Sequence, residues 1–167
     1  MLTRRHLLQA SASILALSGL GAWRALDLPA AAAGSVCLSA PEHLLVQALA
    51  EALFPPGSSL GVSAVGMELA AEVDDLLGDR LEPVVGLVFR YTLAGLNDGT
   101  LVSRGARFVN LPLSERVDVL ARWAEPGVLA RRLAYDALRT VVGMVFFCRP
   151  EVTRAIGWAP PCAEEAA

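Results

Sequence analysis

Few side chains of this sequence combine the types and the spacing that catalysis needs. A hydrolytic triad requires a nucleophile, a base and an orienting group. The two histidines are His6, close to the N-terminus, and His43, which is followed by Leu44 and Leu45. We interpret His43 as an ordinary polar position near the start of a helix, because its neighbours are apolar and none of them would orient it as a general base.

Acidic side chains occur at helical spacing in one stretch, at Glu68, Glu72, Asp75 and Asp79. Such a row could bind a metal ion, but a ferritin-like di-iron site also needs Glu-x-x-His pairs, and the sequence has none. It also has no Cys-x-x-Cys pair of the kind that many zinc sites use. We therefore interpret the row as a solvated acidic helix face, and metal binding by Glu68, Glu72 and Asp75 stays open as an alternative.

Other chemical templates are missing as well. Patterned glycines between a strand and a helix, which phosphate and dinucleotide loops require, do not occur. The net charge of −3 gives no electrostatic footprint for nucleic acid. The sequence therefore predicts no catalytic, cofactor-binding or metal-binding residues on this chain, and it favours a chain that serves another protein.

The N-terminus has a charged start, an apolar stretch and a small-residue cleavage site. Arg4 and Arg5 precede an apolar run over 10–23, and alanines occupy 30–33. This order is typical of a twin-arginine export signal, which carries folded proteins into the bacterial periplasm. The run ends before the roughly 20 residues that a membrane-spanning helix needs. We predict a signal peptide over 1–33, with an ordinary secretion signal as the alternative, and a single periplasmic domain over 34–167.

The apolar spacing within this domain predicts helices and no strands. We expect an all-α fold, a compact bundle of about five helices followed by one more short helix. The expected helices cover 41–54, 64–77, 81–96, 115–123 and 128–147, and the short one covers 150–156. The helix over 128–147 is apolar all round from Val141, which predicts that its end is buried on every side.

Cap and turn residues set the expected limits of these helices. Ser39 is expected to cap the first helix, and Ser114 the fourth. The Asn-Asp-Gly signal at 97–99 is expected to end the third helix in a turn. A loop over 100–112 would then carry a basic patch, formed by Arg104 and Arg107.

The second half of the domain carries a series of short motifs. Phe108 is followed by Leu-x-x-Ser-Glu-Arg at 111–116, and a long helix ending in aromatics leads to Pro-Glu-Val at 150–152 and Ile-Gly-Trp at 156–158. Through this series the stretch 107–158 resembles the gluconate 2-dehydrogenase subunit 3 family. The first half of the domain agrees with the pattern of this family in outline. Two positions depart from the family pattern, Cys148 and Trp158.

The resemblance implies a small, non-catalytic accessory subunit. Members of that family sit on a larger FAD-containing oxidoreductase of the glucose–methanol–choline type, often with a cytochrome c subunit. FAD, and haem c where that subunit occurs, would then belong to the partners and not to this chain. The partner would oxidise a sugar or an alcohol. Arg4 and Arg5 would lead the folded complex through the twin-arginine translocase into the periplasm, where its partners would hold it at the membrane.

The resemblance also suggests where the chain touches the large subunit. Phe146, Phe147 and Trp158 are the expected contact residues, because buried aromatics anchor interfaces well. Each of these three side chains would equally suit the core of the domain itself.

The three cysteines are candidates for disulfides, because the periplasm is oxidising. A bridge between Cys37 and Cys162 would tie the ends of the domain together and leave Cys148 over. Cys148 would then bond to the large subunit or stay as a buried free thiol.

Two other interpretations of the whole chain stay open at this point. The first is a stand-alone periplasmic helical enzyme or metal-binding protein, which would use the carboxylate row. The second is a structural subunit that stays anchored in the membrane because its signal is never cleaved.

Overall fold

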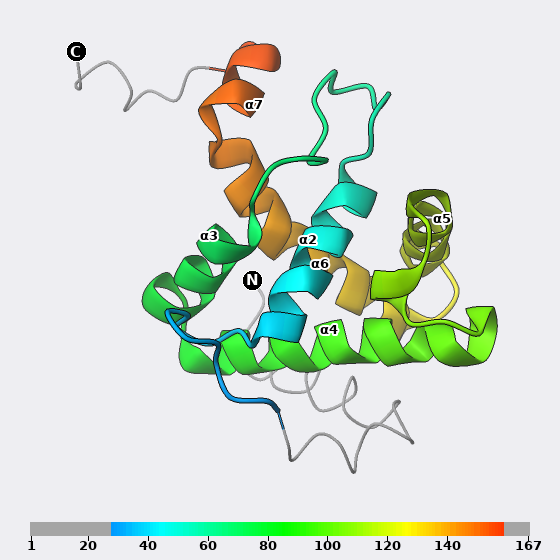
Figure 1. Ribbon diagram of the computed structural model, residues 1–167. Coiled ribbons are helices and arrows are strands. Elements are labelled where there is room, and N and C mark those ends of the chain that lie inside the picture. Colours follow the sequence, from blue (N-terminus) through cyan, green and yellow to red (C-terminus); the bar gives the residue numbers. More distant parts are fainter. Residues whose placement is uncertain (1–27, 159–167) are drawn as a thin grey trace.

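The computed structural model describes residues 28–158 (Figure 1), so Arg4, Arg5 and Cys162 lie outside the described residues. The described part forms six α-helices and no strands, which confirms the expected all-α fold. The helices are α2 (Ala40–Leu53), α3 (Ala70–Asp75), α4 (Pro83–Arg104), α5 (Leu113–Ala124), α6 (Leu129–Cys148) and α7 (Pro150–Ala155). A π-helical turn, Leu76–Arg80, follows α3, and a 3₁₀ turn, Phe108–Asn110, follows α4. None of the helices in this part is both long and apolar enough to cross a membrane.

The helix α2 lies in the middle of the bundle and contacts α3, α4, α5 and α6 (Figure 1). Its N-cap is Ser39, as the sequence predicts. Most of its circumference is buried, and alanines among its buried positions let neighbouring helices approach closely. The buried apolar residues of α2 are Leu45, Val46, Ala48, Leu49, Ala50 and Ala52.

Three phenylalanines close the core at the C-terminal end of α2. The rings of Phe54 and Phe146 are stacked, with centroids 3.9 Å apart and planes 5° apart. Phe147 meets both rings edge-on, at 5.6 Å and 5.3 Å. The edge contacts of Phe147 have a geometry that aromatic rings favour, and the three rings together tie α6 to the end of α2.

The helix α3 begins later than the expected start at residue 64. Gly66 has a φ of 83°, which an α-helix does not accommodate, and it stands in a turn closed by the N–H of Met67, which donates to the carbonyl of Ala64. The helix therefore starts at Ala70 and continues as the π-helical turn to Arg80.

The helix α4 is longer than expected, because the Asn-Asp-Gly signal at 97–99 lies inside it. The side chain of Asn97 accepts a hydrogen bond from the N–H of Val109 at 3.2 Å, so it serves a tertiary contact and not a turn. The hydroxyl of Thr100 donates to the carbonyl of Ala106 at 2.8 Å. The helix ends at Arg104, and Gly105 follows it with a φ of 73°, the left-handed conformation that caps many helices.

Two further expectations in this region are wrong. Arg104 and Arg107 form no free basic patch in a loop, because they pair with Glu115 at 3.5 Å and Asp98 at 3.1 Å. Ser114 is not a cap. The N-cap of α5 is Pro112, which places Ser114 within the first turn.

The helices α6 and α7 begin and end within one residue of the expected limits. The end of α6 is not buried on every side, however, because Met144 is 48% exposed and Cys148 is exposed too. The C-terminal part of α6 is thus apolar on every side, but the rest of the domain leaves one side of it uncovered.

The extension of α4 can be tested with two glycines. Gly99→Ala should raise the free energy of unfolding by about 0.5–1 kcal/mol, because Gly99 lies inside a helix and a Cβ there would meet open space. Gly105→Ala should lower it by about 1 kcal/mol, since position 105 needs a positive φ. Urea unfolding measures both changes. A loss of stability in Gly99→Ala would show that 97–99 is a turn after all.

Candidate functional site

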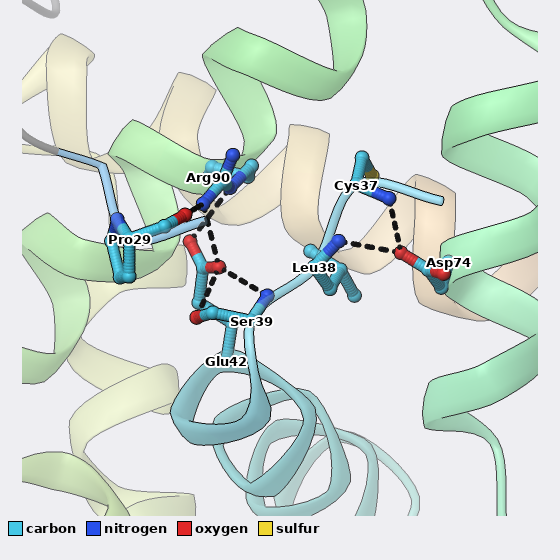
Figure 2. Close-up of polar contacts among 7 residues, drawn as sticks. All are labelled: Pro29, Cys37, Leu38, Ser39, Glu42, Asp74 and Arg90. Atoms are coloured by element: carbon cyan, nitrogen blue, oxygen red, sulfur yellow. Dashed lines mark hydrogen bonds and ion pairs between the residues drawn. The ribbon is translucent and has the colours of Figure 1, made fainter. Parts of the chain in front are cut away.

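The most distinctive polar site in the described part holds residues 29–38, which we call the strap. Asp74 of α3 accepts hydrogen bonds from three successive backbone N–H groups of the strap, and Figure 2 shows those from Cys37 and Leu38. The donors are Val36 at 2.6 Å, Cys37 at 3.0 Å and Leu38 at 2.6 Å. Asp74 is only 2% exposed, so its carboxylate is satisfied almost wholly by this segment.

The surroundings of Asp74 have opposing effects on its pKa. Burial of the carboxyl raises the pKa, but the backbone N–H groups of Leu38, Val36 and Cys37 stabilise the charged form and hold the pKa below the ordinary range. The folded chain therefore favours the charged form of Asp74, and this charge strengthens all three hydrogen bonds.

A second anchor joins the strap to α2 and α4. Arg90 of α4 donates from Nε and Nη2 to the two carboxylate oxygens of Glu42, each at 2.9 Å. Glu42 is 7% exposed, and its Oε2 also accepts from the N–H and the hydroxyl of Ser39. The same Nη2 of Arg90 donates to the carbonyl oxygen of Pro29, at the start of the strap (Figure 2).

An open pocket of about 280 Å³ lies beside the strap. Most of its lining residues are apolar, and the two with a polar side chain are Arg90 and Cys37. The other lining residues are Val36, Leu77, Gly78, Pro83, Gly86 and Leu87. Arg90 already binds Glu42 and Pro29, so this wall offers a small apolar recess and not a set of catalytic groups.

The thiol of Cys37 is poorly suited to chemistry. Burial raises its pKa to about 11, and the hydrogen bond and the charge of Asp74 act in the same direction. A nucleophilic or metal-binding cysteine needs the thiolate. At neutral pH Cys37 is protonated, and it behaves as a half-buried packing residue.

The other residues with candidate chemistry lie apart from one another. The ring Nε2 of His43 is 2.7 Å from the hydroxyl of Ser35, so this side chain fastens the strap to α2. In the acidic row, Glu72 pairs with Arg149 at 2.7 Å, whereas Glu68, Asp75 and Asp79 are exposed. Within residues 28–158, no three His, Cys, Asp or Glu side chains come close enough together to hold a metal ion.

The expected contact residues fall into two environments. Phe146 is fully buried and Phe147 is half-buried, and both belong to the aromatic cluster around Phe54. Trp158 is 52% exposed and follows α7. Of the three, Trp158 is the one that this fold presents to solvent. Cys148 is also exposed, and neither it nor Cys37 is in a disulfide among the described residues.

Sequence patterns alone miss most of the anchor residues. Glu42 could have been found, because it stands three residues after Ser39, and Ser-x-x-Glu is the capping-box pattern. No local pattern distinguishes Asp74 from the carboxylates around it. Its partners lie 36 to 38 residues away in the chain, so only the packing of α3 reveals its role.

Comparisons of the chain with protein-family models, with curated proteins and with solved structures find no match. The function must therefore be argued from the sequence motifs and from the geometry described above.

Replacing the buried carboxylate should destabilise the fold in a pH-dependent way. Asp74→Asn should lower the free energy of unfolding by about 2 kcal/mol or more at pH 7, because the backbone donors lose a charged acceptor. The folded pKa is lowered, so this contribution is present above the unfolded pKa of about 3.9 and fades as the pH falls through the lower folded value.

Urea unfolding at pH 7 and at about pH 3 measures this difference. The matched control is Asp75→Asn, which changes an exposed neighbour on the same helix and should shift stability by no more than about 0.5 kcal/mol. Equal stability of the two variants at pH 7 would contradict the anchoring role of Asp74.

The two described cysteines should react at different rates. An alkylating reagent at pH 8 should label Cys148 at least about tenfold faster than Cys37, because Cys148 is exposed, whereas Cys37 is half-buried with a pKa of about 11. Mass spectrometry of the digested chain measures each rate separately. Faster labelling of Cys37 would mean that the closed strap does not keep this thiol half-buried.

Proposed function

We propose that the chain is a non-catalytic accessory subunit of a periplasmic oxidoreductase complex. It binds a larger FAD-dependent dehydrogenase that oxidises a sugar or an alcohol, and it supplies the twin-arginine signal for the folded complex. FAD belongs to the large subunit in this proposal, and haem c belongs to a cytochrome c subunit where the complex has one.

The motifs that resemble the gluconate 2-dehydrogenase subunit 3 family have positions that suit a scaffold. Phe108 is fully buried and Leu111 nearly so. Arg116 donates from Nη1 to the carbonyl of Ala48 at 2.8 Å and to the carboxylate of Glu51 at 3.0 Å. The Leu-x-x-Ser-Glu-Arg segment thus fixes α5 onto α2. Such residues build a rigid helical body, which is what a subunit needs in order to present a surface to a partner.

The observation that carries the proposal is the exposure of three large apolar side chains, one near the C-terminal end of α6 and two directly after α7. Met144 is 48% exposed, Ile156 is 38% exposed and Trp158 is 52% exposed. A partner that covers these three side chains together would bury apolar surface, which is what protein association sites do. Tryptophan is the side chain most enriched among residues that dominate binding energy.

Cofactor chemistry gives the reason for a shared export signal. FAD is inserted in the cytoplasm, so its host protein has to fold before it is exported. A host without a signal of its own would need a bound carrier, and Arg4 and Arg5 would then serve both chains. This accounts for an export signal for folded cargo on a chain whose sequence offers no cofactor motif.

The partner is best sought by tagging this chain and purifying it from the periplasm. We expect a larger chain to co-purify and the eluate to show flavin absorption bands. Trp158→Ala should reduce the amount of the large chain, because the loss of a central aromatic contact costs about 2 kcal/mol or more. Leu44→Ala is the matched control, since Leu44 is an exposed apolar side chain on α2.

Replacement of both Arg4 and Arg5 by lysine should leave both chains in the cytoplasm, and fractionation with immunodetection measures where each chain is. A single colourless chain in the periplasm would refute the proposal. Normal export of the large chain in the double-lysine variant would refute its carrier part alone.

A further inference from the structure

The alanine run at 30–33 lies between the two anchors of the strap. On its N-terminal side, the carbonyl of Pro29 accepts a hydrogen bond from Arg90. On its C-terminal side, Asp74 binds the backbone N–H groups of Val36, Cys37 and Leu38. The segment predicted to be cleaved is therefore fastened to the folded domain at both ends.

The backbone between the anchors is folded back on itself. The N–H of Ala32 donates to the carbonyl of Leu38 at 2.9 Å, and the N–H of Ser35 donates to the carbonyl of Ala32 at 3.0 Å. Gly34 has a φ of 83°, which places a turn directly after the alanines. An enzyme that binds a peptide as an extended strand pairs with the backbone groups of that peptide, and here the N–H and the carbonyl of Ala32 are already used.

We propose that the folded domain controls the cleavage of its own N-terminal segment. The peptide bonds between Ala30 and Gly34 are hydrolysed only after the strap opens. Asp74 and Arg90 set the fraction of molecules in which the strap is open. In that step water adds across the C–N bond, with its hydroxyl on the carbonyl carbon and its proton on the new amine. The proposal rests on the proposed function in one respect, because cleavage here would remove the export signal.

The anchors exist only when three helices are packed together. Asp74 comes from α3 and lies 36 to 38 residues from its partners in the strap. Arg90 comes from α4, lies 61 residues from Pro29 and is itself held by Glu42 of α2. An unfolded chain cannot hold these contacts, because each one closes a long loop. Protection of the alanine run is therefore a property of the tertiary structure.

Gly78 offers a way to loosen the strap without removing a charge. A Cβ built on Gly78 would lie 2.2 Å from Cγ1 of Val36 and 2.5 Å from its Cβ. The second of these atoms is fixed to the backbone, so the contact between the strap and the π-helical turn that carries Gly78 has to open. Gly95 of α4 is the matched position, because a Cβ there would meet nothing within 4 Å.

Limited proteolysis of the purified full-length chain tests the proposal. The probe is an endopeptidase of the elastase class, which cuts after small residues, and mass spectrometry gives the rate of cutting within 29–34. A synthetic peptide of residues 28–40 is the unprotected reference. We expect the folded chain to be cut at least about a hundredfold more slowly than the peptide, because cleavage follows the population of the open state.

Two variants then locate the protection. Asp74→Asn and Gly78→Ala should each be cut at least about tenfold faster than the native sequence, since each raises the open population. Asp75→Asn and Gly95→Ala should keep the native rate. Far-ultraviolet circular dichroism checks that each variant is folded. If Asp74→Asn is unfolded, the rate at which folded Gly78→Ala is cut decides whether the proposal holds.

Two outcomes would overturn the proposal. One is cleavage of the native chain at the rate of the peptide. The other is cleavage of folded Gly78→Ala at the native rate. The assay uses neither a partner nor export, so either result leaves the accessory-subunit proposal intact. A failed pull-down, in turn, says nothing about protection of the strap.

Discussion

The buried ion pair between Glu42 and Arg90 is the interaction on which much of this structure depends. The side chains are only 9% and 13% exposed, and burying two charges is costly unless their hydrogen-bonding groups are satisfied. Here both carboxylate oxygens accept from the guanidinium, and one of them also accepts twice from Ser39. One carboxylate thus fixes the start of α2, the register of α4 and, through Pro29, the path of the strap.

The opposite end of α2 is held by different chemistry. There the stacked rings of Phe54 and Phe146 join α6 to the helix end, and the guanidinium of Arg116 joins α5 to its middle. A polar network at one end and an aromatic cluster at the other leave α2 little freedom to slide or rotate. Because α2 contacts four other helices, its position determines theirs.

Those parts of the fold that depend on local signals could be predicted from the sequence. The limits of α2, α6 and α7 follow from proline, glycine and the apolar period. The end of α4 could not be predicted, because the Asn97 side chain bonds to Val109 and a turn signal is absorbed into a helix. The role of Asp74 in the candidate site could not be predicted from local signals either. Asp74 resembles the acidic residues around it until the packing of α3 brings it to the strap.

The two surfaces that matter most lie at different ends of the molecule. In Figure 1 the strap runs past the α3 end of α4, whereas α7 and the end of α6 lie at the opposite pole. A partner seated around Trp158 would therefore leave the anchors at Asp74 and Arg90 uncovered. The two regions are nevertheless joined through α3, because Arg149, directly before α7, pairs with Glu72 of α3. The strap depends on the packing of α2, α3 and α4, so its closed form requires that this domain is folded.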